Sequence, residues 1–135
     1  MKFCFAEIAA IAFLCVMGCT AGKYPEASTA LEAGREFIDG CLKGDFDKAS
    51  AYMISDSANE SDLLKIKRDY DSKSKDQQNS YATASIIISE DAAVNDSTHV
   101  INYKNSYDQF ARKVMVVQRN GVWKVDFKYT FNGNL

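Results

Sequence analysis

The sequence predicts an α+β fold in which helices come first and a four-stranded antiparallel sheet follows. Residues 26–71 carry apolar side chains at helical spacing, whereas residues 81–131 alternate apolar and polar side chains with a period of two. Asn120-Gly121 separates two of these alternating runs, which is the strongest short-range signal of a β-hairpin. This order of elements indicates helices packed on one face of an antiparallel sheet.

The first helix is expected over residues 26–43, with an apolar stripe through Leu31, Gly34, Ile38 and Cys41. Gly44 offers a left-handed C-terminal cap to this helix, because glycine adopts positive φ without strain. A sharp turn between two helices is therefore expected at this glycine.

Asp45 follows Gly44 and is a good N-cap for a second helix that carries Phe46, Ala49, Tyr52 and Met53 on one side. A third helix is expected over residues 61–71, with Leu63, either Ile66 or Lys67, and Tyr70 inward. Residues 72–79 are uniformly polar and are expected to fray.

Four strands are expected, over residues 81–89, 98–104, 109–118 and 122–131. In the last strand Trp123, Val125, Phe127, Tyr129 and Phe131 face one way, while Lys124 and Asp126 face solvent. A two-residue Asn-Gly loop fixes the hairpin register, because a slip of one residue would expose the aromatic row. The expected pairs are Gln118–Trp123, Val116–Val125, Val114–Phe127 and Arg112–Tyr129.

The N-terminus begins with one positive charge at Lys2, followed by an apolar run over residues 8–17. This run is too short to cross a bilayer and fits the apolar region of a signal peptide. The segment ends in Val16-Met17-Gly18-Cys19, which resembles the lipobox of bacterial lipoproteins. The resemblance predicts a signal peptide over residues 1–18, a lipidated tether over residues 19–25 and a single α+β domain over residues 26–135.

The lipobox resemblance also implies a modification and a location. The Cys19 thiol would receive a diacylglycerol, and attached acyl chains hold a protein to a membrane through the burial of their methylene groups. The lipid then makes a membrane-spanning segment unnecessary, and the expected location is the cell envelope. Thr20 stands where an Asp commonly marks inner-membrane retention in Gram-negative lipoproteins, so the outer membrane is favoured over the inner membrane.

Composition excludes several functional classes. Residues 1–18 contain one Lys and one Glu, so the rest of the chain keeps the net charge of −2 of the whole sequence, and no basic stripe suits a nucleic acid. Besides Cys19 only Cys41 remains after residue 18, so no internal disulfide is expected, and Cys41 is interpreted as an inert buried thiol. His99 is the only histidine, which excludes a multi-histidine metal site, and no cofactor is expected.

Two stretches, residues 42–49 and 114–125, resemble the nuclear transport factor 2-like (ketosteroid isomerase-like, cystatin-like) superfamily, and in particular its small uncharacterised bacterial lipoproteins. The first is the Gly-Asp joint between two helices, and the second is the closing hairpin with its Gly-Val-Trp-Lys segment. The resemblance implies a long first helix lying across a curved sheet, so that the domain is cone-shaped with an open mouth.

Six residues are candidates for the lining of such a cone, each chosen because it carries an aromatic or charged side chain on a predicted inward face: Arg112, Tyr129, Trp123, Tyr103, Tyr52 and Tyr70. For the aromatic side chains, packing in the core is the alternative to a role in binding. Arg112 is either an anion anchor or a charge at the rim whose stem covers apolar surface. His99 shares strand parity with Tyr103 and is interpreted as a rim residue.

No catalytic set is evident, because no carboxylate is placed on the aromatic face, and a fold alone does not imply an enzyme. The favoured hypothesis is therefore a non-enzymatic envelope lipoprotein that binds a small ligand or an envelope protein. The alternative is an isomerase- or dehydratase-like enzyme with a carboxylate in the cone, whose pKa an apolar pocket would adjust. A third hypothesis is a homodimer formed through the outer face of the sheet, which carries Lys113, Met115, Lys124 and Asp126.

Overall fold

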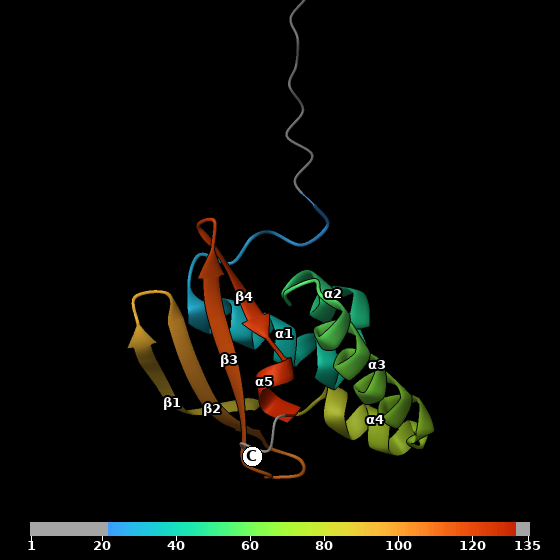
Figure 1. Ribbon diagram of the computed structural model, residues 1–135. Coiled ribbons are helices and arrows are strands. Elements are labelled where there is room, and N and C mark those ends of the chain that lie inside the picture. The colour runs from blue at the N-terminus through green and yellow to red at the C-terminus, as the bar shows by residue number, and fades with distance from the viewer. Residues whose placement is uncertain (1–21, 132–135) are drawn as a thin grey trace, which may run out of the picture.

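The computed structural model describes residues 22–131 and has helices followed by a four-stranded sheet (Figure 1), which confirms the predicted α+β class. The sheet is an antiparallel meander in the order β1-β2-β3-β4. None of the helices within residues 22–131 is long and apolar enough to cross a membrane. The elements are α1 (Ala30–Lys43), α2 (Phe46–Ala51), α3 (Ser57–Ser72), α4 (Lys75–Ala82), β1 (Ile86–Asn95), β2 (Thr98–Asn105), β3 (Arg112–Arg119), β4 (Val122–Asp126) and α5 (Lys128–Phe131).

The joint between α1 and α2 forms as the sequence predicts. Gly44 has a φ of 69° and caps α1, and the Asp45 carboxylate accepts a 3.1 Å hydrogen bond from the backbone N–H of Lys48 at the start of α2. The expected start of α1 at residue 26 is wrong by one turn. The hydroxyl of Thr29 caps the helix by accepting from the Glu32 N–H, so α1 begins at Ala30.

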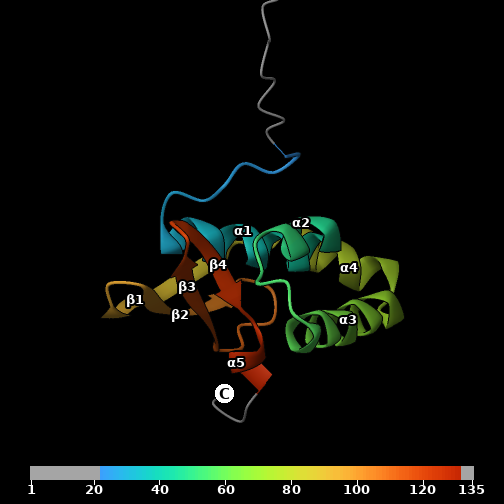
Figure 2. The same cartoon turned by 45° about the horizontal axis from the view of Figure 1, so that its top comes forward.

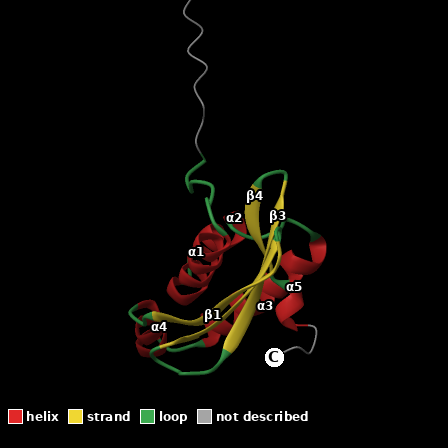
Figure 3. Cartoon of the chain, turned by 90° about the vertical axis from the view of Figure 1, so that its left-hand side faces the viewer, coloured by secondary structure: helices red, strands yellow, loops and turns green. Residues whose placement is uncertain are grey.

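Helix α1 lies along one face of the sheet (Figure 3) and approaches it closely at Gly34. A Cβ atom at this position would lie 2.6 Å from Cδ1 of Ile101, a separation that real side chains do not reach. The absence of a side chain therefore lets the helix backbone rest on Ile101, Val114 and Val116. Helix and sheet enclose the core in this way.

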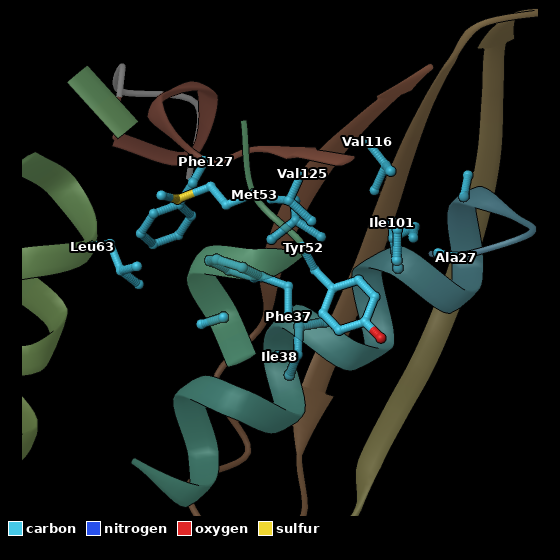
Figure 4. Close-up of a cluster of buried hydrophobic side chains, with 14 residues drawn as sticks. Ala27, Phe37, Ile38, Tyr52, Met53, Leu63, Ile101, Val116, Val125 and Phe127 are labelled. Carbon is cyan, nitrogen blue, oxygen red and sulfur yellow. The ribbon is translucent and has the colours of Figure 1, made fainter. Parts of the chain in front are cut away.

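The core gathers side chains from α1, from the segment after α2 and from β2, β3 and β4 (Figure 4). Its fully enclosed members include Phe37, Met53, Ile101, Val116 and Val125. Every member of this cluster lies between residues 27 and 127. Within the described part of the chain, residues 22–131, this cluster joins the helices to the sheet.

The β3–β4 hairpin has the predicted turn, with a φ of 52° at Asn120 and 76° at Gly121. The predicted pairs Gln118–Trp123 and Val116–Val125 are confirmed. The predicted length of the last strand is wrong, because β4 ends at Asp126 and residues 128–131 form the short helix α5. The pairs Val114–Phe127 and Arg112–Tyr129 therefore do not form, and Tyr129 lies on a helix.

Asn59 explains why the strand ends. Its side chain is fully buried on α3, and its Oδ1 accepts a 2.6 Å hydrogen bond from the backbone N–H of Lys128. Its Nδ2 donates to Oδ1 of Asp126 at 3.1 Å and to Oδ2 of Asp56. The chain after Asp126 therefore bonds to α3 rather than to β3, and the hydroxyl of Thr130 donates to the Lys113 carbonyl.

Asp126 was expected to face solvent and is instead only 6 % exposed. Besides the bond from Asn59, its Oδ1 accepts from Nζ of Lys128 at 2.7 Å. Lys124 was likewise expected to be solvated, but its ammonium donates to the Ala51 carbonyl at 3.1 Å. Charged groups on this face thus connect β4 to α2, α3 and α5 rather than forming a free outer surface.

Residues 75–82 form α4, where the sequence predicted a fraying polar segment followed by a strand from residue 81. Ser74 and Gln77 form a reciprocal capping box at its start, and the Gln78 amide donates to the Tyr70 carbonyl of α3 at 3.0 Å. Strand β1 consequently starts at Ile86 and continues through the predicted loop to Asn95, with irregular pairing near Ser89 and Val94. Figure 2 shows α3 and α4 at the side of the domain opposite the β1–β2 turn, and α4 contacts α1.

We predict that Asn59→Ala lowers the free energy of unfolding by at least about 2 kcal/mol, since it leaves buried partners on Asp126 and Lys128 without their hydrogen bonds. Denaturant titration followed by circular dichroism measures the change. Asn79→Ala is the matched control, because Asn79 is exposed on α4 and should change stability by less than about 0.5 kcal/mol. Equal effects of the two substitutions would contradict the role given to Asn59.

Candidate functional site

A cavity of about 240 Å³ lies between α1, α3, α4 and the end of the sheet farthest from the β3–β4 hairpin. Its wall is mostly apolar and aromatic, with charged groups from α3 and β3. This volume is slightly below the roughly 300–1,000 Å³ typical of pockets for drug-sized ligands. The lining residues are Phe37, Ile38, Cys41, Leu42, Ile66, Asp69, Tyr70, Lys73, Tyr81, Tyr103, Asn105, Arg112, Phe127 and Thr130.

Three of the six candidate lining residues meet in this cavity. Arg112 and Tyr103 are direct neighbours across β3 and β2, as their strand parity indicates, and Tyr70 faces them from α3. The other three candidates, Tyr52, Trp123 and Tyr129, are not among the lining residues.

Each of these three candidates lies elsewhere for a clear structural reason. Tyr52 packs into the core, where its hydroxyl donates to the Pro25 carbonyl at 2.7 Å. Trp123 lies near the hairpin and meets the His99 ring edge-on, with 5.2 Å between the ring centroids. Tyr129 leaves the sheet because α5 replaces the end of the predicted strand.

Arg112 forms a bidentate ion pair with Asp108 beside the cavity. Its Nη1 donates to Oδ1 at 2.9 Å and its Nη2 to Oδ2 at 2.6 Å. The Asp108 side chain is only 7 % exposed and also accepts from Asn105 Nδ2 and from the Phe110 N–H. Although burial opposes ionisation, the hydrogen bonds from Arg112, Phe110 and Asn105 hold the pKa of Asp108 well below its usual range.

The same contacts order the β2–β3 loop. The Asn105 side chain, 2 % exposed, accepts from the N–H groups of Tyr107 and Asp108. Tyr107 then packs edge-on against the cavity residue Tyr81, with 4.9 Å between the ring centroids. The Asp108–Arg112 pair therefore holds a loop that supports one wall of the cavity.

Tyr103 and Cys41 place two polar atoms at the inner wall. Burial raises the pKa of the Tyr103 phenol, and it raises the pKa of the Cys41 thiol to about 12. Both groups are therefore protonated at neutral pH. The Tyr103 hydroxyl has no hydrogen-bond partner within residues 22–131, which leaves it available on the cavity side.

At the α3 side of the cavity, Lys73 is paired with Asp69 and lies over the Tyr81 ring, with Nζ 5.6 Å from the ring centroid. Among the lining residues that the structure describes, Asp69 is the only one with a carboxylate, and its side chain is 68 % exposed. The structure therefore places no carboxylate in the apolar interior of this cavity. Within residues 22–131, no group of three acidic, His or Cys side chains is placed to hold a metal ion.

A second, open depression lies beside α1 and α2 and is polar. Lys48 is its central group, because its Nζ meets Glu36 at 2.6 Å and Asp39 at 2.8 Å. These two carboxylates raise the pKa of Lys48 although burial opposes the shift. Because Lys48 is already paired with Glu36 and Asp39, a ligand would gain little from its charge, and the depression is a weaker candidate for a binding site than the cavity.

Sequence reasoning missed the contribution of Asp108, Tyr81 and Lys73. The first expected strand includes Tyr81, and Asp108 falls between the second and third expected strands, where no role is predicted for it. One signal was present for Asp108, since an acidic residue four positions before Arg112 across a tight loop can form an ion pair with it. The capping box of Ser74 and Gln77 was the corresponding signal for α4 and hence for Tyr81.

Comparison with known proteins gives no relative: no family model, no curated protein and no solved structure matches this chain.

We predict that Asp108→Asn lowers the free energy of unfolding by about 2 kcal/mol at pH 7, because it removes charge-assisted hydrogen bonds. The pKa of Asp108 is depressed in the folded protein. The contribution of its charge is therefore complete at neutral pH and is lost as the pH falls below about 4, the range in which the unfolded chain takes up a proton. Denaturant titrations at pH 7 and pH 3 should show the difference from wild type narrowing at the lower pH.

Asp71→Asn is the control for this prediction. Asp71 forms an ion pair with Lys67 on α3, and both side chains are about half exposed, so the expected loss is below about 1 kcal/mol. A loss at Asp108 as small as the loss at Asp71 would contradict the structural role of the Asp108–Arg112 pair.

Proposed function

We propose that the chain is a lipid-anchored protein of the cell envelope whose domain binds a small ligand in the cavity. The observation that carries the proposal is the cavity itself, which combines an apolar wall with an available Tyr103 hydroxyl and neighbouring Arg112. Concave, mostly apolar sites with a few convergent polar groups are the usual form of small-molecule sites.

The proposed anchor is Cys19, which lies outside the described residues and rests on the lipobox resemblance. The position of the cavity is compatible with an anchor there. In Figure 1 the described chain begins above α2, where the Tyr24 hydroxyl donates to the Asp45 carboxylate, whereas the strand ends that carry Tyr103, Asn105 and Arg112 lie at the lower end of the sheet. A membrane at the N-terminal end would leave the cavity open to the aqueous side.

We also propose membership of the nuclear transport factor 2-like superfamily as the finer description of the fold. The order of helices before an antiparallel meander supports it, as does a cavity between the first helix and the inner face of the sheet. The early end of β4 at Asp126 is a departure from the expected long closing strand.

Binding is favoured over the isomerase or dehydratase alternative. That chemistry needs a carboxylate whose apolar surroundings adjust its pKa. Asp69 is exposed at the edge of the cavity and paired with Lys73, and Asp108 has its oxygens occupied by Arg112, Asn105 and Phe110. Neither carboxylate is in a position to take a proton from a ligand in the apolar interior.

We predict that Cys19→Ala abolishes acylation and moves the protein from the membrane fraction to the soluble fraction of a bacterial host. Cys41→Ala should leave both properties unchanged, because Cys41 lies inside the folded domain. Metabolic labelling with an alkyne-tagged fatty acid, followed by membrane fractionation, measures the two properties. Labelling that persists in Cys19→Ala would contradict the proposed anchor.

We predict that Ile66→Trp reduces binding of small neutral aromatic compounds such as acetophenone at least tenfold, because the indole fills cavity space beside Tyr70. Leu64→Trp is the matched control, since Leu64 lies on the same helix, is 45 % exposed and does not line the cavity. Ligand-observed NMR with the chain from residue 20 onward measures the affinity. Equal binding by the two variants would contradict the cavity as the binding site.

A further inference from the structure

We infer that the cavity selects uncharged ligands that carry a hydrogen-bond acceptor, and that Tyr103 is the residue that recognises this acceptor. The inference rests on the proposed function and names the class of ligand for the same site. Three properties of the cavity support it: the donors at its polar end, the cancellation of its charges and the apolar character of its opposite wall.

The polar end offers donors rather than acceptors. The Tyr103 phenol stays protonated at neutral pH because burial raises its pKa, and no residue within 22–131 accepts its hydrogen. Arg112 is its direct cross-strand neighbour and has five N–H groups and no acceptor. Three hydrogen bonds from Arg112 go to Asp108 and to the Phe110 carbonyl, so N–H groups remain for a ligand. An acceptor between these donors would satisfy both residues.

The charges around this end cancel within the protein. Asp108 neutralises Arg112 through two hydrogen bonds, and Asp69 neutralises Lys73. An anionic ligand would have to compete with Asp108, whose carboxylate is nearly buried and accepts from three different residues. A cationic ligand would meet the guanidinium of Arg112. The head group that fits is therefore neutral.

The remaining wall suits an apolar body. Phe37 and Phe127 lie with their ring centroids 4.9 Å apart, and Ile38, Leu42 and Ile66 complete this side. Burial of apolar surface against these side chains supplies a non-directional attraction, whereas the hydrogen bond to Tyr103 fixes the orientation of the ligand. A compact apolar molecule with one carbonyl oxygen meets both requirements.

The experiment uses acetophenone, ethylbenzene and benzoate, which share a phenyl ring and differ in the head group. Affinities are measured by ligand-observed NMR on the chain from residue 20 onward, which contains the core cluster between residues 27 and 127. Tyr103→Phe should weaken acetophenone binding about three- to tenfold, the effect of one neutral hydrogen bond, and should leave ethylbenzene within about twofold. Tyr24→Phe makes the same chemical change at a tyrosine that does not line the cavity and should alter neither affinity.

Unchanged ethylbenzene binding by Tyr103→Phe also shows that the variant keeps a folded cavity. If acetophenone binds equally well to wild type and to Tyr103→Phe, the inference is wrong while the proposed binding function stands. Tighter binding of benzoate than of acetophenone would likewise overturn it, because the cavity would then be an anion site. If none of the three compounds binds to wild type, both the inference and the proposed function fail.

Discussion

The close approach of α1 to the sheet at Gly34 is the constraint on which the rest of the structure depends. At this residue the helix backbone rests on Ile101, Val114 and Val116, because no side chain separates them. Two turns later Cys41 and Leu42 face the larger side chains of Tyr103 and Arg112, and a cavity lies between them. The cavity thus results from a small contact residue at one end of the interface and bulky partners at the other.

Hydrogen bonds between α3, the end of β4 and α5 hold the wall of the cavity that α3 contributes. Asn59 connects α3 to Asp126 at the end of β4 and to the Lys128 N–H at the start of α5. This connection fixes α3, which contributes Ile66 and Tyr70 to the cavity, relative to the sheet. Burying an amide costs little free energy when all its hydrogen bonds are made, and those bonds specify one arrangement of α3 against the sheet. Apolar packing alone would tolerate several arrangements. The position of the cavity wall therefore depends on hydrogen bonds that lie outside the cavity.

Local signals account for the parts of the fold that could be predicted from the sequence. Gly44, Asp45 and Asn120-Gly121 act through their own backbone preferences, so the helix joint and the hairpin register followed from a few residues. The end of β4 could not be predicted, because residues 127–131 keep the alternation of a strand and only the distant Asn59 diverts them. Strand parity correctly predicts that Arg112 and Tyr103 lie together. It does not predict that Asp108 neutralises the Arg112 guanidinium, because Asp108 lies in the loop between the two strands.

Whether the Arg112 guanidinium is paired with a carboxylate decides whether the cavity suits an anionic or a neutral ligand. An arginine at the end of an aromatic sheet face is an anion anchor only while its guanidinium lacks a carboxylate partner. Here both terminal nitrogens of the guanidinium donate to the Asp108 carboxylate, and Asn105 and the loop backbone hold that carboxylate in place. The ion pair is therefore part of the fold. What remains for a ligand is a neutral end with spare donors, from the Arg112 N–H groups and the Tyr103 hydroxyl. The ion pair that stabilises the β2–β3 loop is thus also the basis of the proposal that the cavity takes an uncharged acceptor.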